Sequence, residues 1–523
     1  MRNKVIMGLL LIAFLALLPA SQAKAMSTTN TAVRIKQEAD LVILTPHWHG
    51  IYDLYIAEFK EYWKNKTGQD ITIDVIERGT SECLRLVREV WKGEPEADVW
   101  WGGGLDAFRI AEEEGYLAPF YNESDPEWVA INESIPAMLY GLPLKDLDSE
   151  YGKYNWWGSA LSGFGIMYNK LYLQQHGLPE PKDWADLANP IYKGHITMTP
   201  PSKSGSNHMI VEIILQTYGW EEGWRLLTLI AANVREYQEK SYHVPGLVGE
   251  GEYGLAPVID FYGFGQIASK GPDVVGFIYP PAGNGSHTII NPDSIAILKN
   301  AKHPKLAYEF VKFVLSYDGQ KLLFESPINR LPVRPDVYEE APAGYFNPFE
   351  VELTLMTYDS DKAANRWDIV NDLFDVLLVN RHSELVAAWS GIISANRTIN
   401  DAAEMGYDVS AAREKLDRAI NELTKVPITE EWVEAHYEDY ENATFKEEAL
   451  SEWDAFAVSK YKNASDLAWE ASTAVASYVI EHLRSVANQN LWIGFGGGFI
   501  LGLIIGVGVV ALYYRRKWKV AVT

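Results

Sequence analysis

The sequence contains a single cysteine, Cys83, and this scarcity removes two possibilities. A disulfide framework needs at least two cysteines, so the fold depends on its hydrophobic core instead. Because Cys83 also lies far from the N-terminal segment, we expect no lipid-attachment cysteine there. We predict that Cys83 is a small buried residue on a helix.

Basic residues are also scarce relative to acidic ones. The chain has 46 Lys and Arg residues against 70 Asp and Glu residues, and its formal net charge is −24. Proteins that bind nucleic acid present clusters of Lys and Arg to the phosphate backbone, so we expect no nucleic-acid partner. An acidic surface of this kind keeps an exported protein soluble.

Long apolar runs are confined to the two ends of the chain. Near the N-terminus, Arg2 and Lys4 precede an apolar run over residues 5–18, and Ala23-Lys24-Ala25 fits the small-x-small pattern that signal peptidase cleaves. This combination predicts a secretory signal peptide over residues 1–25. A permanent N-terminal anchor is the alternative.

The second apolar run, residues 491–514, carries no charge and is long enough to cross a bilayer. Basic residues follow it directly and favour a cytoplasmic location for the tail over residues 515–523. We therefore expect a single-pass anchor in the cell membrane with the bulk of the chain extracellular; a buried core helix is the alternative. Three glycines at four-residue spacing in this run would allow two such helices to dimerise: Gly498, Gly502 and Gly506.

Seven Asn-x-Ser/Thr sequons lie on the predicted outer side of the membrane. They are Asn65, Asn122, Asn132, Asn284, Asn396, Asn442 and Asn463. This distribution predicts a glycosylated surface protein of eukaryotic or archaeal type.

Short apolar strands alternate with amphipathic helices over residues 40–390, a pattern that predicts an α/β fold with a parallel sheet covered on both faces. Strands are predicted at residues 41–45, 71–76, 97–101, 163–168, 194–199, 254–259 and 274–279. Helices are predicted at residues 51–66, 79–91, 203–218 and 304–316.

Strand signals stop after about residue 395. Residues 399–423 and 430–483 are rich in Ala, Glu, Lys and Leu, which predicts helices. We interpret residues 395–488 as a helical stalk or small bundle between the α/β body and the membrane. The alternative is that residues 350–425 complete the α/β body.

An ordered series of short motifs then suggests a family. The motifs are Thr45-Pro46-His47, Glu77 to Ser81, Ala97 to Gly104, Ser162 to Lys170, Pro201 to Ser206, and Asn329 to Arg334. In this order the chain resembles the extracellular solute-binding proteins of ABC importers, in the iron/thiamine/spermidine-type group with the type II periplasmic-binding fold. The resemblance covers about residues 40–345.

This resemblance implies two α/β lobes that close on a small solute, which is then delivered to an ABC permease and its ATPase. Lobe 1 would comprise residues 40–160 and 270–390, and lobe 2 residues 161–269. The family carries out no catalysis, and no nucleophile–base pairing or zinc spacing stands out in the sequence, so we do not expect an enzyme. The C-terminal anchor departs from the bacterial pattern and, with the sequons, suggests an archaeal version.

Ligand-binding loops in open α/β folds lie at the carboxyl ends of strands, and candidate residues fall there. The most favourable anion site is the helix start at Ser204-Gly205-Ser206, which offers hydroxyl groups, free N–H groups and the positive end of the helix dipole. Ordinary helix capping is the alternative at this position. The other candidates are His47, Trp48, Thr80, Ser81, Trp101, Gly103, Ser159, Asp260 and Tyr262.

A metal is a second possibility for the solute. Iron-binding members of the family use adjacent tyrosines as ligands of Fe³⁺, whereas this chain has Phe261-Tyr262 and so only one phenol. His47, Glu77 and Tyr262 form a possible hard-cation site. We expect no firmly bound cofactor, and we consider three functions: a receptor for an anionic or phosphate-bearing solute, a ferric-iron receptor, and a structural or adhesive surface protein.

Overall fold

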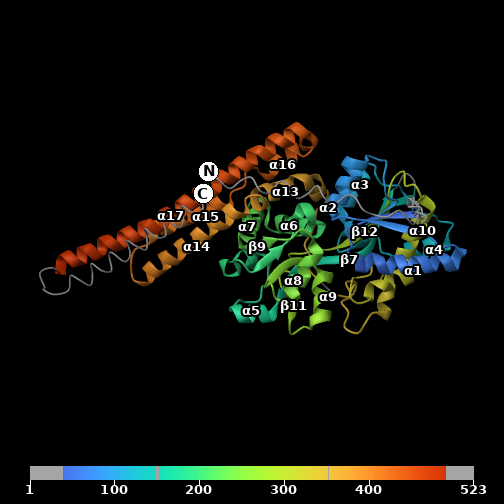
Figure 1. The fold of residues 1–523 in the computed structure, drawn as a ribbon, viewed down its shortest axis with the longest axis horizontal. Helices are drawn as coiled ribbons and strands as arrows, with labels where there is room; N and C mark the ends of the chain where they lie inside the picture. The colour runs from blue at the N-terminus through green and yellow to red at the C-terminus, as the bar shows by residue number, and fades with distance from the viewer. Residues whose placement is uncertain (1–38, 149–151, 352, 491–523) are drawn as a thin grey trace, which may run out of the picture. The chain divides into compact units, whose positions relative to one another are not determined.

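The computed structural model describes residues 39–148, 152–351 and 353–490 (Figure 1). The signal peptide (residues 1–25), the membrane helix (residues 491–514) and the cytoplasmic tail (residues 515–523) predicted above lie outside these ranges. Within the part of the chain that the structure describes, no helix is both long and apolar enough to span a membrane.

The strands are β1 Leu41–Thr45, β2 Ile73–Glu77, β3 Val99–Gly104, β4 Met138–Leu139, β5 Leu142–Pro143, β6 Lys145–Asp148, β7 Lys153–Asn169, β8 Ile196–Met198, β9 Val234–Tyr237, β10 Leu255–Ile259, β11 Val275–Ile278 and β12 Ile290–Ile297. The helices of the two-lobed body are α1 His49–Thr67, α2 Thr80–Arg85, α3 Leu105–Glu113, α4 Pro126–Ser134, α5 Lys170–His176, α6 Gly205–Tyr218, α7 Trp220–Asn233, α8 Val244–Gly249, α9 Asp260–Lys270, α10 Pro304–Leu315 and α11 Tyr317–Lys321. The later helices are α12 Ser360–Asn365, α13 Trp367–Phe374, α14 His382–Glu404, α15 Ser410–Thr424, α16 Glu430–His436 and α17 Ala443–Asn490.

Strand β1 is the centre of lobe 1. It pairs in parallel with β2 and β3, as the alternating pattern predicts, and Ile43 and Leu44 are fully buried within it. Helix α2 carries Cys83, which is buried and free; this confirms its predicted environment. The carboxyl ends of β1, β2 and β3 lie next to one another and deliver three successive loops to one edge of the sheet.

The full sheet is mixed rather than parallel. Its strands follow the order β2-β1-β3-β12-β7-β10-β8-β9, and β12 is antiparallel to both β3 and β7. Strand β12 was not predicted from the sequence. Pro292 and the polar residues Asn291, Asp293 and Ser294 interrupt its apolar pattern, yet all eight residues of the strand are buried. A buried strand with this composition needs partners from elsewhere in the chain.

Strand β7 connects the two lobes. It is 17 residues long, and its first half pairs with β12 while its second half pairs with β10 and β11. Strand β11 pairs with the second half of β7, so residues 270–278 belong with the strands of lobe 2. The predicted second segment of lobe 1, residues 270–390, therefore begins too early. The chain therefore returns to lobe 1 only after β11.

The C-terminal helices begin earlier than predicted. Helix α14 starts at His382, inside the segment predicted as lobe 1, and residues 399–423, predicted to be helical, contain a turn at Gly406, where φ is +84° and α14 gives way to α15. Helices α14, α15 and α17 pack against one another, and α14 and α15 also contact α7 (Figure 1). We refer to residues 382–490 as the helical arm.

The arm is attached to lobe 2 through buried aromatic side chains. The indole N–H of Trp389 donates to Asn233 Oδ1 at 2.8 Å, and the indole N–H of Trp220 donates to the carbonyl of Ile428 at 2.9 Å. Indole groups are rarely buried without such a partner. Because α14 and α15 pack on α7, part of the segment predicted as a stalk also covers the α/β body.

Candidate functional site

A cavity of about 70 Å³ lies between the two lobes. Lobe 1 contributes the loops that follow β1, β2 and β3, and lobe 2 contributes the first residues of α6 and α9. Strands β7 and β12 form the back wall through Ser162, Asn291 and Asp293. The cavity therefore lies where the carboxyl ends of the parallel strands meet, the usual position of a ligand in open α/β folds.

The N-terminus of α6 opens into this cavity. Ser204 is the N-cap, and its hydroxyl accepts the N–H of Asn207 at 3.3 Å. Gly205 and Ser206 are the first residues of a 14-residue helix, so their N–H groups have no acceptor within it. These two N–H groups and the positive end of the helix dipole suit an anion.

Glycines allow the two lobes to touch beside the cavity. A Cβ atom at Gly205 of lobe 2 would lie 2.6 Å from Cβ of Thr80 in lobe 1. A Cβ atom at Gly79 would lie 2.3 Å from the carbonyl oxygen of Lys203. Such distances are far below van der Waals contact, so this closed arrangement of the lobes requires glycine at both positions.

Ser81, a predicted ligand residue, contributes to lobe contact instead. Its hydroxyl donates to the carbonyl of Pro201 in lobe 2 at 3.1 Å, and it does not line the cavity. Thr80, its neighbour, lines the cavity and is buried. The start of α2 thus serves both as cavity wall and as contact between the lobes.

A buried charged cluster forms one end of the cavity. Asp293 Oδ1 accepts the N–H of Gly103, and Asp293 Oδ2 contacts the guanidinium of Arg330. His47 Nε2 lies 2.9 Å from Asp293 Oδ2 and 2.9 Å from Arg330 Nη1, and Arg330 Nη2 donates to Ser162 Oγ at 2.9 Å. Arg330 is only 1 % exposed, so this guanidinium is held almost entirely by the protein.

The protonation states in this cluster follow from burial and charge. Burial alone would raise the pKa of Asp293, but Arg330, His47 and the N–H of Gly103 together hold it well below its ordinary value. Burial lowers the pKa of His47 and outweighs the opposing effect of Asp293. The cluster is therefore an ionised Asp293–Arg330 pair beside a neutral imidazole, with no net charge.

One donor of this cluster remains available. His47 Nε2 cannot both donate to Asp293 and accept from Arg330, because a ring nitrogen of a neutral imidazole either carries the proton or offers a lone pair. Beside the ionised Asp293, Nε2 carries the proton and donates, so Nδ1 is an acceptor, and it has no hydrogen-bond partner among the described residues; Arg330 Nε also has none there. Both side chains line the cavity, so the Arg330 Nε–H group is a candidate for a ligand oxygen and His47 Nδ1 for a ligand hydroxyl.

An aromatic wall completes the cavity. It comprises Trp48, Phe261 and Tyr262, and the Arg330 guanidinium lies 4.6 Å from the centre of the Phe261 ring. Burial raises the pKa of Tyr262 to about 12, and its hydroxyl lies 3.5 Å from Ser241 Oγ. Tyr262 is therefore a neutral phenol at physiological pH.

Most of the predicted ligand residues line this one cavity. They are His47, Trp48, Thr80, Gly103, Ser204, Gly205, Ser206 and Tyr262. These residues come from both lobes. The first and the last of them, His47 and Tyr262, are more than 200 positions apart in the sequence, so the fold brings them together.

Three other predicted residues support the cavity from behind. Trp101 packs edge-to-face on His47 with ring centres 4.7 Å apart, and the hydroxyl of Ser159 donates to the carbonyl of Asp293 at 2.8 Å. Asp260 accepts the N–H of Gly163 at 2.6 Å and the hydroxyl of Tyr279 at 2.8 Å. None of the three lines the cavity, so each positions a neighbour rather than facing a solute.

The possible cation site over His47, Glu77 and Tyr262 is not assembled. Glu77 accepts a hydrogen bond from Tyr52 at 3.0 Å and does not line the cavity, and His47 Nε2 is occupied by Asp293 and Arg330. In residues 39–148, 152–351 and 353–490 no group of three or more His, Cys, Asp or Glu side chains is arranged to hold a metal ion.

Several cavity residues were not predicted as ligand residues: Ser162, Lys203, Met209, Asn291, Asp293 and Arg330. Lys203 directly precedes the predicted anion site at Ser204, and Ser162 and Arg330 lie inside the motifs that carry the family resemblance, but their residue types alone did not mark them as facing a solute. Asp293 lies on the undetected strand β12, and its partner His47 is 246 positions away.

The central half of the chain, residues 106–365, matches the family described as bacterial extracellular solute-binding protein. The two-lobed body is that of a solute-binding protein of ABC importers. The solved structure of the periplasmic binding protein AfuA from Actinobacillus pleuropneumoniae, with fructose-6-phosphate bound, supports this fold. Its sequence is 20 % identical to this one. The match covers 64 % of this chain and 97 % of that structure's chain, with a TM-score of 0.54.

Curated relatives include proteins named for the transport or uptake of two kinds of solute. The phosphoglycerate transport regulatory protein PgtC of Salmonella typhimurium is 29 % identical over 304 residues, which is 56 % of this chain and 68 % of that protein. Iron uptake protein A1 of Synechocystis is 22 % identical over 333 residues, 61 % of this chain and 84 % of that protein. The protein described here is thus a solute-binding receptor.

Proposed function

We propose that this receptor captures a small phosphate-bearing solute in the interlobe cavity and delivers it to an ABC permease. One observation carries the proposal: the free N–H groups of Gly205 and Ser206 open into the interlobe cavity at the positive end of α6. Phosphate is well matched to such a helix start. The relative named for phosphoglycerate and the neighbour with bound fructose-6-phosphate support the same chemistry.

The rest of the cavity suits the remainder of such a solute. Lys203 adds a positive charge at its edge, and the neutral Asp293–Arg330–His47 cluster leaves the Arg330 Nε–H group for a ligand oxygen and His47 Nδ1 for a ligand hydroxyl. The rings of Trp48 and Phe261 can cover the carbon skeleton. A volume of about 70 Å³ favours a compact solute.

Ferric iron is the second candidate, and iron-named relatives favour it. The cavity offers the single phenol of Tyr262 where two adjacent tyrosines would be expected. We therefore rank iron below a phosphorylated solute.

The decisive experiment is calorimetric titration of the purified protein with 3-phosphoglycerate, fructose 6-phosphate, inorganic phosphate and Fe³⁺. We expect at least one phosphorylated compound to bind with micromolar or tighter affinity, and Ser206→Ala to weaken that binding. Binding of Fe³⁺ with a visible absorption band that Tyr262→Phe removes would instead establish the iron receptor. Absence of binding by every compound would contradict a receptor for these solutes.

We also propose that the receptor is exported by its N-terminal signal and held in the cell membrane by residues 491–514, with the arm between membrane and cavity. Six of the seven sequons are exposed and would accept glycans, whereas Asn132 Oδ1 accepts hydrogen bonds from Lys145 and Tyr154. Mass mapping should therefore find glycans at Asn65 or Asn396 but not at Asn132. Release of the protein from membranes by salt alone would contradict the anchor.

A further inference from the structure

Residues 353–379, which include α12 and α13, form a third connection between the lobes, in addition to β7 and the chain that leads into β12. We call this segment the strap. It begins against lobe 2 and the crossing chain: the N–H of Met356 donates to the carbonyl of Thr288 at 3.1 Å, and the N–H of Asp359 donates to Gln216 Oε1 at 2.8 Å. It ends at the first helix of the arm.

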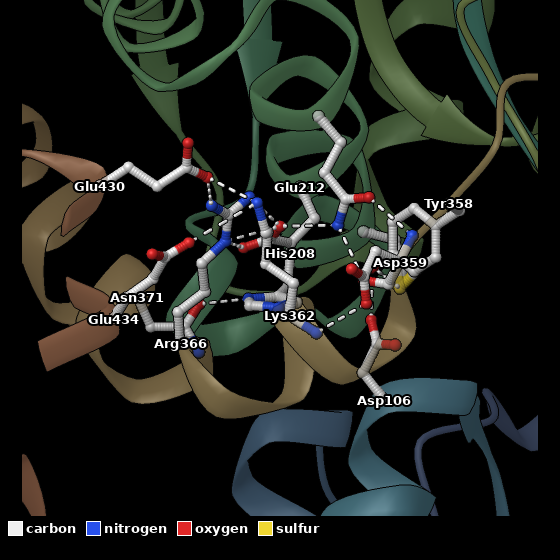
Figure 2. A network of polar contacts seen from close by, with 12 residues as sticks. Asp106, His208, Glu212, Tyr358, Asp359, Lys362, Arg366, Asn371, Glu430 and Glu434 are labelled. Atoms are coloured by element: carbon white, nitrogen blue, oxygen red, sulfur yellow. Dashed lines mark hydrogen bonds and ion pairs between the residues drawn. The ribbon is translucent and has the colours of Figure 1, made fainter. Parts of the chain in front are cut away.

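Tyr358 lies in the strap between the two lobes (Figure 2). Its hydroxyl donates to Asp106 Oδ2 of α3, in lobe 1, at 2.6 Å and lies 3.7 Å from Met209 Sδ of α6, in lobe 2. Met209 also lines the solute cavity. A single buried side chain thus contacts lobe 1 and the residue that forms the cavity wall in lobe 2.

The strap also contacts lobe 1 through α12, which packs against α3, and through ion pairs near the surface. Asp361 pairs with Arg109 of α3, and Asp368 lies 2.9 Å from Arg88. Both strap carboxylates are substantially exposed, 67 % for Asp361 and 44 % for Asp368. Exposed pairs contribute little to stability, so the packing of α12 on α3 and the buried Tyr358 contact hold the strap to lobe 1.

The contacts of the strap with lobe 2 are buried. Arg366 Nη2 lies 2.7 Å from Glu212 Oε2 of α6, and the two side chains are 2 % and 0 % exposed (Figure 2). His208 of α6 hydrogen-bonds Asn371 at 2.9 Å and packs on Trp367 with ring centres 3.6 Å apart. Breaking a buried pair leaves an uncompensated charge, so this side stays attached.

The same arginine also contacts the helical arm. Arg366 Nη1 donates to Glu430 Oε1 of α16 at 2.9 Å, and Lys362 lies 3.1 Å from the same oxygen. Farther along, Lys446 of α17 lies 2.7 Å from Asp372 of the strap. The strap therefore joins the arm to α6, the helix whose N-terminus forms the anion site.

We propose that Tyr358 is a positioning residue of the solute site, and that the strap couples closure of the lobes to the helical arm. When the lobes close on a solute, α3 approaches α6 and the Asp106–Tyr358 contact forms against Met209. When the lobes open, the Tyr358 contact between Asp106 and Met209 is lost, while Glu212–Arg366–Glu430 keeps the strap, α6 and the arm together. The inference adds coupling to the proposed binding function and rests on it only where a solute is used.

The first test compares Tyr358→Phe with wild type by stopped-flow binding of 3-phosphoglycerate. Removing a buried hydroxyl that holds the closed lobes should speed dissociation about three- to tenfold and leave the association rate unchanged. Tyr253→Phe is the control, because Tyr253 is also a buried tyrosine and its hydroxyl donates to Glu236 at 2.9 Å within lobe 2 alone. Equal dissociation rates in the two variants would overturn the positioning role.

The second test needs no solute and uses hydrogen exchange of the full chain. In Tyr358→Phe and in Asp361→Asn/Asp368→Asn we expect faster exchange in α3 and α16, which do not contain the changed residues, and wild-type exchange in Tyr253→Phe. Changes confined to residues 353–379 would overturn the coupling. If wild type binds no phosphorylated compound, the proposed function fails, and this second test still decides the coupling.

Discussion

The two parts of helix α6 face the same interlobe region but meet different surroundings. At its start, Gly205 and Ser206 present N–H groups that the described chain leaves to the cavity. One to three turns later, His208 Nδ1, Glu212 and Gln216 have partners in Asn371, Arg366 and Asp359 of the strap. The chain thus supplies its own partners where rigidity is needed and leaves donors free where a solute binds.

Of the variants considered, the one that removes the strap partner of Glu212 should lower the free energy of unfolding most. Arg366→Met leaves a fully buried carboxylate without a counter-charge, which typically costs about 3–5 kcal/mol. Urea denaturation should show a loss of that size. The double variant Glu212→Leu/Arg366→Met should recover most of it, and a loss below about 1 kcal/mol in the single variant would show that the pair is not a structural link.

A pH dependence distinguishes the buried Asp106–Tyr358 contact of the strap from the solute cavity. Burial raises the pKa of Asp106 from 3.8 to about 8, against the opposing hydrogen bond from Tyr358. The folded protein therefore retains a proton that the unfolded chain releases near pH 4. The contribution of Asp106 to stability is complete below pH 4 and is lost as the pH rises toward 8, by order of 1 kcal/mol per pH unit.

Asp106→Asn tests this dependence. The asparagine still accepts the hydroxyl of Tyr358 but does not ionise, so the stability difference between variant and wild type should grow between pH 5 and pH 8 in favour of the variant. Thermal or urea unfolding at three pH values in that window measures it. A difference that is the same at every pH would mean that Asp106 does not titrate there.

At the other end of α6, Ser206→Ala and Ser204→Ala should behave differently. Ser206 has no capping role, so its loss should weaken binding of a phosphorylated solute about three- to tenfold with unchanged stability. Ser204 caps the helix, so its loss should also cost about 1 kcal/mol of stability. Equal stability losses in the two variants would remove the distinction between cap and ligand residue.

The smallest effect is expected at Lys203. Lys203 lines the cavity, its side chain is 44 % exposed, and its ammonium pairs with Glu239. Lys203→Met should therefore weaken binding less than threefold, and only at low salt. Lys270→Met, which removes a similar exposed pair with Glu250 in lobe 2, serves as the control. A salt-independent loss would place Lys203 in direct contact with the solute.

Local patterns predicted what depends on local sequence. The parallel strands β1, β2 and β3 alternate or run apolar between turns, and the helix start at Ser204 has the residue types of an N-cap. Both features are visible within about ten residues. The long helices of the arm were also predicted, although their break at Gly406 was not.

Features that depend on distant partners could not be predicted. Strand β12 is buried although it carries Asn291 and Asp293, because Asp293 is matched by Arg330 and His47 from other parts of the chain. Nothing in the sequence around Arg366 indicates that its charge pairs with Glu212, which lies 154 positions earlier. Pairing over such separations is decided by the fold, not by local spacing.

Titration with a matched pair of compounds tests the central claim most directly. Calorimetry with 3-phosphoglycerate and with glycerate, which differ only in the phosphate, isolates what the start of α6 recognises. The account predicts saturable binding of the phosphorylated compound, none of glycerate, and weaker binding of the former by Ser206→Ala. Equal binding of both compounds, or binding of Fe³⁺ alone, would contradict it.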